Sequence, residues 1–425
     1  MAEVRIMTGI CLVLAALTAV GQTAPSPTLT LREVYQLAEQ NYPLIKDAAF
    51  IDKIEDVSLE SIQRSGLPQI SLNGVGQVQS ENITIPLGEN VLEAPTETYN
   101  LYVGVNYDLY DGGAKKAQRN IETASANVER KSLDVQLRRT KERVNNLVFA
   151  ISLARKQKQI LQTSRDDLDT NIATLQAGYE NGVVLESEVA KLKVRQLELA
   201  SEIIKTDGNI DTYFALLGQL TGRVFPRDIQ IDMPKEYPPF QLNEVSRPEQ
   251  ELFNNQKRLF EAQESSISAR TRPKISLFAQ GGIGYPNPLN FADFSTAPYG
   301  LGGIKLNWNL IDFGKGNLDK QRLQLQQEQV EVDRELFLFD VNSEAKEYQE
   351  KIATLEAQIE NDETIVQFQQ EILDQSQVQL DNGVINSNDY VTQVNATINA
   401  EQQLEFNRIQ LEQTIIDYLT LLGQL

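Results

Sequence analysis

Apolar residues recur along two very long stretches of the chain with the spacing of packed helices. Between Ala114 and Gln176 there is no proline or glycine, and apolar or small side chains repeat every seven residues. One row comprises Leu133, Thr140, Leu147, Ala154, Leu161, Leu168 and Leu175, and a second comprises Leu137, Val144 and Ile151. A strict seven-residue repeat indicates left-handed coiled-coil packing. About 63 helical residues would extend for roughly 95 Å, far beyond an ordinary globular helix.

A second stretch, from about Lys315 to Leu380, has a similar pattern and is richer in glutamine, which suits a face that lines water. Each long stretch is followed by a short turn that contains Asn-Gly. A further helical pattern follows each turn, over Leu185–Leu217 and Asn386–Leu422. The chain is therefore expected to form two long helical hairpins.

Shorter segments alternate apolar and polar residues with the period of a strand. The four apolar sets are Ile70, Leu72, Gly74, Gly76 and Val78; Tyr99, Leu101, Val103, Val105, Tyr107 and Leu109; Ile275, Leu277, Ala279 and Ile283; and Ile304, Leu306, Trp308 and Leu310. Alternation over about ten residues with aromatic residues near the ends fits an outer-membrane barrel strand. It also fits an ordinary half-buried antiparallel sheet, which the alternation alone favours.

The chain is internally duplicated. Leu67–Leu72 resembles Arg272–Leu277 at an offset of 205, and Leu216–Leu220 returns unchanged as Leu421–Leu425 at the same offset. Two further matches, of Tyr107–Gly113 with Trp308–Gly314 and of Asn181–Val183 with Asn382–Val384, have an offset of 201. Each copy opens with a predicted helix, Thr28–Ser65 or Ser246–Arg270, that ends before a proline. We expect repeats over residues 22–223 and 247–425, joined by a proline-rich linker over 224–246.

The N-terminus has the pattern of a secretory signal over residues 1–21. Arg5 precedes the apolar run Ile6–Val20, and small residues favour cleavage after Gly21 or, as a second choice, after Ala24. The alternative is a membrane anchor, but fifteen residues are too short to span easily. Cys11 lacks the small residue normally found before a lipoprotein cysteine. The remaining chain has no run of about 18 apolar residues, which leaves an exported soluble protein or a β-barrel membrane protein.

The amino-acid composition excludes several classes of function. The chain has 39 basic and 59 acidic residues and a net charge of −20, which argues against a nucleic-acid partner. It contains no histidine and one cysteine, Cys11, so Cys–His zinc sites, disulfides and Ser-His-Asp triads are excluded. Carboxylate or Ser-Lys chemistry stays possible. No GxxxxGK[ST] motif is present, and no cofactor is expected.

The number of strands indicates an oligomer. Four strands cannot close a barrel across a bilayer, and unpaired strand edges are not tolerated in lipid. Three chains would supply twelve strands, an even number within the known range. The same homotrimer would also bring six helical hairpins together.

With these features the chain resembles the TolC family of outer-membrane efflux and secretion ducts. The resemblance rests on the order and duplication of the opening helix that ends at Leu67-Pro68, the strand–helix junctions, the Asn-Gly turns and the closing Leu217-Gly218. It implies a trimeric twelve-stranded outer-membrane β-barrel, in contact with lipid, that continues into a long α-helical periplasmic tunnel. Such ducts work with a periplasmic adaptor and an inner-membrane transporter. The alternatives are an exported structural or adhesive coiled-coil protein and an envelope enzyme that uses carboxylates.

The resemblance also implies site residues. The strand–helix junctions are Asp111, Gly112, Gly113, Asp312, Phe313 and Gly314, and the tips that would dock the adaptor are Asn181, Gly182, Val183, Asn382, Gly383 and Val384. In the family an acidic residue six positions after each turn glycine lines the periplasmic entrance, and here these positions hold Glu188 and Asp389. The alternative for both is a solvated helix face. Some members close the entrance with a Tyr–Arg lock, but those positions are Leu380 and Ile385 here.

Overall fold

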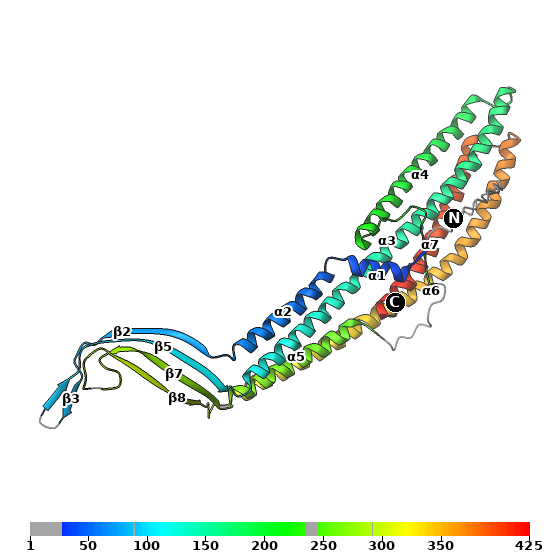
Figure 1. Ribbon diagram of the computed structural model, residues 1–425. Coiled ribbons are helices and arrows are strands. Elements are labelled where there is room, and N and C mark those ends of the chain that lie inside the picture. The colour runs from blue at the N-terminus through cyan, green and yellow to red at the C-terminus, as the bar shows by residue number, and fades with distance from the viewer. Residues whose placement is uncertain (1–27, 88–89, 235–244, 291) are drawn as a thin grey trace, which may run out of the picture.

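The computed structural model describes residues 28–87, 90–234, 245–290 and 292–425. The expected signal segment 1–21 and part of the expected linker, residues 235–244, lie outside the described residues. The described chain is a long rod with helical hairpins at one end and a curved sheet at the other (Figure 1).

The two long helices are present and slightly longer than predicted. Helices α3 (Ala114–Glu180) and α6 (Lys315–Asp381) have 67 residues each, so each extends for about 100 Å. Helices α4 (Glu186–Thr221) and α7 (Ser387–Leu422) complete the two hairpins. Among the described residues, no helix combines the length and the apolar content that crossing a bilayer requires.

The seven-residue rows form the core of the helical part. In the first row every member is buried except Leu147, which packs at the edge of a buried cluster. Leu161, Leu168 and Leu175 contact a cluster that includes Leu199 of α4 and Val394 of α7. Burial of these side chains, at about 25 cal/mol per Å² of apolar surface, is the main force that holds the two hairpins side by side.

Two helices, not one, open the chain. The prediction of a single helix over Thr28–Ser65 was wrong: β1 (Thr28–Thr30) is followed by α1 (Leu31–Asn41) and α2 (Ile45–Arg64). Tyr42 is extended, at φ −63° and ψ 128°, as expected for the residue before Pro43. Strand β1 pairs in parallel with β6 (Gln230–Asp232), which lies in the expected linker. The second opening helix, α5 (Pro248–Arg270), is confirmed, with proline in its first turn.

The sheet contains the four predicted strands and joins the two repeats. Its order is β2 (Gln69–Val78), β5 (Glu97–Tyr110), β7 (Lys274–Tyr285) and β8 (Ala297–Asn307), and all neighbours are antiparallel. A small hairpin of β3 (Thr84–Leu87) and β4 (Asn90–Glu93) extends beyond the far end of the sheet and was not predicted (Figure 1). Strands β2 and β8 are the edges.

Almost all of the predicted apolar positions share one face of the sheet. Ile70 pairs with Val105, Leu101 with Ile283, and Leu277 with Ile304. Along β5 and β7 this face is mostly exposed while the polar face is half-buried, so the sheet curves with its polar side inward. Two details differ from the prediction. A bulge between Asp108 and Tyr110 places Tyr110, not Leu109, opposite Ile275, and β8 ends at Asn307, before Trp308 and Leu310.

Candidate functional site

The two hairpin tips have the same backbone structure. Gly182 and Gly383 adopt φ values of +75° and +69°, and each follows an asparagine that ends a long helix. The N–H of Val183 donates to the carbonyl of Gly178 at 3.0 Å, and the N–H of Val384 donates to that of Gln379 at 2.8 Å. Together with 5→2 bonds from the two glycines, these are Schellman caps, which favour glycine at the left-handed position. The duplicated Asn-Gly-Val sequence therefore fixes two equal tips.

The tips expose apolar side chains. Val183, Leu185 and Val384 are 79%, 71% and 71% exposed. The two asparagines bond back to their own helices: the Nδ2 atoms of Asn181 and Asn382 donate to the carbonyls of Ala177 and Val378. Apolar groups held on a rigid turn at the end of a rod are suited to contact another protein.

Glu188 links the two hairpins. It lies in the first turn of α4, and one carboxylate oxygen accepts a hydrogen bond from the Lys191 Nζ at 2.9 Å. The other accepts the backbone N–H of Ser387, the first residue of α7, at 2.8 Å. The Lys191 ammonium and the Ser387 N–H hold the pKa of Glu188 below its usual range, so the carboxylate is charged at neutral pH.

Asp389 is exposed and lies at the same helix N-terminus that Glu188 reaches. Its carboxylate accepts the Asn386 N–H at 3.5 Å, while the Asn386 side chain accepts the N–H groups of Asn388 and Asp389. This reciprocal capping box starts α7. The structure thus brings both sequence-predicted acidic residues close to each other at the tip of the rod.

The positions of the expected Tyr–Arg lock have an apolar environment. Leu380 is buried, and the half-buried Ile385 packs against the same cluster as Val189, Leu192 and Tyr390. Within this cluster the Asn171 Nδ2 donates to the hydroxyl of the buried Tyr390 at 2.6 Å. This bond joins α3 to α7. Neither this bond nor the Glu188–Ser387 contact was predicted, because both join residues about 200 positions apart and leave no pattern in the sequence.

The two strand–helix junctions also share one design. The Asp111 carboxylate accepts the N–H groups of Gly113 and Lys115 at 2.8 Å each, and Asp312 accepts those of Gly314 and Gly316 at 3.0 and 2.9 Å. Hydrogen bonds from Gly316 and Gly314 lower the pKa of Asp312. A carboxylate at this place satisfies N–H groups that a helix start leaves free and complements the helix dipole.

Phe313 occupies the place that glycine holds in the first junction. Gly112 has φ +72° and Phe313 has φ +53°, a conformation that costs a side chain about 1–2 kcal/mol. Glycine is needed at 112 because a Cβ there would lie 3.0 Å from the Ala269 carbonyl oxygen. Phe313 is 94% exposed, and Trp308, which follows β8, is 52% exposed.

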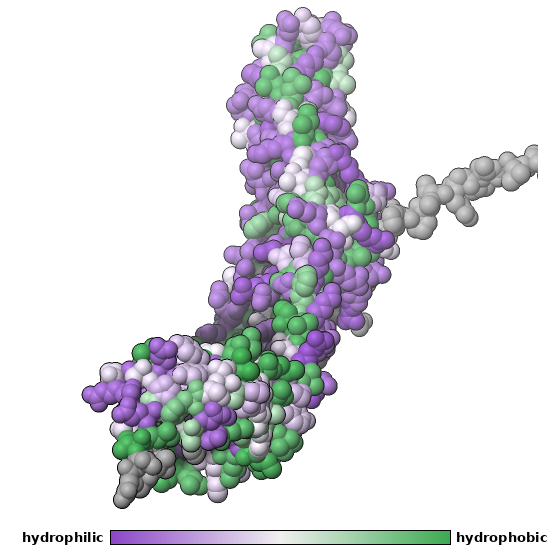
Figure 2. Space-filling view, turned by 60° about the vertical axis from the view of Figure 1, so that its left-hand side comes forward, coloured by the Kyte–Doolittle hydropathy of each residue, from purple (hydrophilic) through white to green (hydrophobic). Residues whose placement is uncertain are grey.

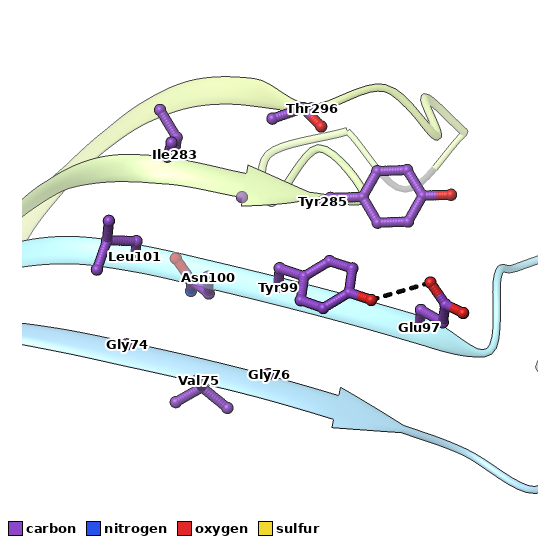
Figure 3. A pocket seen from close by; sticks show the side chains of 11 residues that line it. Gly74, Val75, Gly76, Glu97, Tyr99, Asn100, Leu101, Ile283, Tyr285 and Thr296 are labelled. Atoms are coloured by element: carbon purple, nitrogen blue, oxygen red, sulfur yellow. Dashed lines mark hydrogen bonds between the residues drawn. The ribbon is translucent and has the colours of Figure 1, made fainter.

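The convex face of the sheet exposes apolar side chains and has aromatic residues at both ends. Hydrophobic areas are visible on the surface of the sheet end of the molecule in Figure 2. Tyr99 and Tyr285 lie at the outer end, with ring centroids 6.2 Å apart, and the Tyr99 hydroxyl donates to Glu97 at 3.0 Å (Figure 3). They line a cavity of about 590 Å³ beside Gly74 and Gly76. From Tyr99 to Tyr110 the strand rises about 36 Å, or roughly 28 Å at a 40° tilt. This height matches the apolar band of a membrane barrel.

The comparisons with known proteins agree with this architecture. A family model described as outer membrane efflux protein matches residues 34–223. The match covers a little less than half of the chain. The resemblance inferred from the sequence is confirmed. No curated protein sequence matches the chain.

Solved structures of outer-membrane channels share the fold of nearly the whole chain. CusC, whose structure is described in terms of transmembrane channel formation, superposes with a TM-score of 0.67 at 15% identity over 92% of both chains. The outer membrane protein VceC of Vibrio cholerae has a TM-score of 0.64 at 14% identity, over 92% of this chain and 96% of its own. The CmeC outer membrane channel of Campylobacter jejuni has a TM-score of 0.61 at 14% identity, over 99% of this chain and 94% of its own. The predicted fold class, long helical hairpins with a small β portion, is confirmed.

The described residues contain no group of three His, Cys, Asp or Glu side chains that could hold a metal ion.

Proposed function

We propose that this protein is the outer-membrane exit duct of a tripartite efflux or type I secretion system. The observation that carries the proposal is the curved sheet, apolar on its convex face and polar on its concave face, joined to two 67-residue helices. An exported coiled-coil rod would have no use for an apolar face of this height. Conduction is passive, and the partner transporter supplies the energy.

The duct requires three copies of the chain. Strands β2 and β8 have no partner on their outer edges within the described sheet, and open edges are very costly in lipid. The helical part has open sides that match them. Helices α2 and α4 lie along one side of the rod and α6 along the other (Figure 1). Because α2 leads into β2 and β8 leads into α6, each side of the rod is continuous with one sheet edge.

Both sides carry exposed apolar rows at corresponding heights. One side has Phe50, Ile54 and Val57 on α2 near the sheet, and Val194, Leu197 and Ile204 on α4 near the tip. The α6 side has Leu318, Leu325, Val332 and Phe339 near the sheet, and Ile365, Phe368 and Ile372 near the tip. The two sides differ in sequence, so a contact between the α2–α4 side of one copy and the α6 side of the next would be heterologous. A threefold rotation would close such contacts into a ring.

The expected assembly is a trimer that conducts ions. Mass measurement in detergent should give three times the chain mass, since three chains supply the twelve strands of a barrel. Reconstitution into planar bilayers should give discrete conductance steps. A monomer or dimer in detergent, or recovery of the protein from the periplasm without detergent, would contradict the proposal and favour the coiled-coil alternative.

The tips are proposed to dock the periplasmic adaptor. Changing Val183 or Val384 to Asp should abolish export and adaptor cross-linking while the trimer still reaches the membrane, because each change puts a charge into an apolar contact. Glu186→Asp, at another exposed position near the first tip, serves as the control. Normal export by both tip variants, with assembly intact, would place docking elsewhere.

The proposal includes the division of the chain. A signal peptide over 1–21 would deliver repeats 22–223 and 247–425, linked by 224–246, to the envelope. The sheet would then lie in the outer membrane and the hairpins in the periplasm.

A further inference from the structure

The dipeptide Asn-Gly occurs three times in the chain, and the fold places the three copies differently. Asn181-Gly182 and Asn382-Gly383 lie at the exposed hairpin tips, whereas Asn73-Gly74 lies in the middle of β2. Asparagine is a thermolabile residue, and it is most reactive before glycine, because glycine has no side chain that shields its backbone nitrogen. The three pairs share this chemistry, so a difference in their reactivity must come from the fold.

The reaction is deamidation, which needs water as its only co-reactant. The backbone nitrogen of the glycine loses its proton and attacks Cγ of the asparagine side chain. A new N–Cγ bond forms, the Cγ–Nδ2 bond breaks, and ammonia leaves. Water then opens the resulting succinimide ring at either carbonyl and yields aspartate or isoaspartate. Each event therefore converts a neutral amide into a carboxylate, and isoaspartate also lengthens the backbone.

Little structure opposes this reaction at the tips. Ring closure requires the asparagine backbone to rotate, which takes the glycine N–H away from its acceptor. The Gly182 N–H donates to the Tyr179 carbonyl at 2.9 Å, and the Gly383 N–H donates to the Leu380 carbonyl at 3.0 Å. A Cβ on either glycine would meet nothing within 4 Å. The exposed turns thus have room to change shape when these hydrogen bonds break.

Asn73 is held much more firmly. Strand β2 pairs in unbroken register with β5, and Asn73 lies opposite Tyr102 while Gly74 lies opposite Leu101. The Asn73 Nδ2 donates to the Ser71 hydroxyl at 2.9 Å, and a Cβ on Gly74 would lie 3.4 Å from the Leu101 side chain. Rotation of the backbone here would break the ladder in the middle of a strand. The reaction would therefore require local unfolding of the sheet.

The two tip amides have a structural role that a carboxylate cannot fill. The Nδ2 atoms of Asn181 and Asn382 donate to the carbonyls of Ala177 and Val378 at 2.8 and 2.7 Å, in the last turns of α3 and α6. An ionised carboxylate has no proton to donate. It also adds negative charge at the end of a helix where the dipole is already negative. Deamidation thus replaces an attraction at the tip by a repulsion.

We propose that Asn181 and Asn382 are sites of spontaneous deamidation in the folded protein, that β2 protects Asn73, and that each event loosens the helix cap of its tip. Because the tips are also the proposed docking surface, the product places a carboxylate beside the exposed Val183 or Val384. Only this last consequence rests on the proposed function. The reaction and the loss of the cap do not depend on it.

The first test follows the reaction itself. The purified trimer is kept in warm, mildly alkaline heavy-oxygen water, which labels each new carboxylate, and is then digested in ordinary water for mass spectrometry. Asn181 and Asn382 should be labelled several-fold faster than Asn73, and faster at higher pH because the glycine nitrogen must lose its proton. In urea all three should react at similar rates. Unlabelled tips, tips labelled no faster than Asn73, or an Asn73 that stays slower in urea would overturn the proposal.

The second test measures the cap. Asn382→Asp mimics one product and should speed hydrogen exchange several-fold at the Val384 N–H, which donates to the Gln379 carbonyl. Gln379→Glu is the matched control, because it adds the same charge at an exposed position in the last turn of α6 and keeps the Asn382 amide. Equal exchange in the two variants would refute the role of the cap. Normal adaptor binding by fully labelled trimers would instead contradict the proposed docking site and leave the chemistry standing.

Discussion

Replacing Leu101 or Val103 by arginine is expected to destabilise the membrane-inserted trimer by about 2–4 kcal/mol. Both side chains lie mid-strand on the convex apolar face of β5, where Leu101 pairs with Gly74 and Ile283, and Val103 with Leu72 and Gly281. A guanidinium at that depth would be surrounded by hydrocarbon. The measurement is urea-induced unfolding of the trimer in lipid vesicles, followed by the loss of the trimer band in electrophoresis.

The matched control is Asn106→Arg on the same strand. Asn106 is exposed on the concave face, where it pairs with Gln69 and Phe278, so arginine there would face the water-filled lumen. Asn100 and Gly104 on the same face are less suitable. The Asn100 side chain accepts the Tyr299 hydroxyl at 2.8 Å, and Gly104 is buried. Equal damage from Asn106→Arg and Val103→Arg would mean that the convex face does not contact lipid.

The regular parts of the molecule could be predicted from the sequence because their periodicity has a direct physical cause. The row from Leu133 to Leu175 repeats every seven residues because those side chains must face a neighbouring helix. The strands alternate because one face of the sheet is apolar. The turn at each hairpin tip could also be predicted, because a left-handed residue after a helix favours glycine, as at Gly182 and Gly383.

The irregular parts could not be predicted, and each has a local or long-range cause. Pro43 interrupts the first helix although the apolar pattern continues through it. The bulge at Asp108–Tyr110 reverses which residue faces outward, and a one-residue irregularity of this kind leaves no trace in an alternating pattern. The pairing of β1 with β6 joins residues about 200 positions apart. For the same reason the spacing to the turn glycine suggested a role for Glu188 but not its contact with Ser387.

The structure also distinguishes the two members of the acidic pair. The Glu188 carboxylate on α4 accepts hydrogen bonds from Lys191 and from the N–H of Ser387 on the other hairpin. The Asp389 carboxylate accepts a hydrogen bond within the capping box that starts α7. Glu188 therefore joins the two hairpins, and Asp389 helps to start a helix of one of them.

The second large effect concerns ion selectivity. The wild-type channel is expected to be cation-selective, and the double variant Glu188→Gln/Asp389→Asn should lose most of that selectivity. Three copies of each residue would place six carboxylates around one narrow opening, and charge rings at a constriction concentrate counter-ions. Reversal potentials in a salt gradient across planar bilayers measure the effect. Block by multivalent cations from the periplasmic side should weaken in parallel.

The control for charge elsewhere on the rod is Glu129→Gln, at an exposed position partway along α3. Asp134 is less suitable because its carboxylate lies 3.0 Å from the Lys131 Nζ.

The charge of Glu188, and with it cation selectivity, should depend on pH in one direction. Because the pKa of Glu188 is lowered, its charge persists through the neutral range and is lost only as the pH falls below the usual range for glutamate. The share of the cation selectivity that Glu188 supplies should follow the same course. An unchanged reversal potential in the double variant would show that Glu188 and Asp389 lie on a solvated helix face and do not line the entrance.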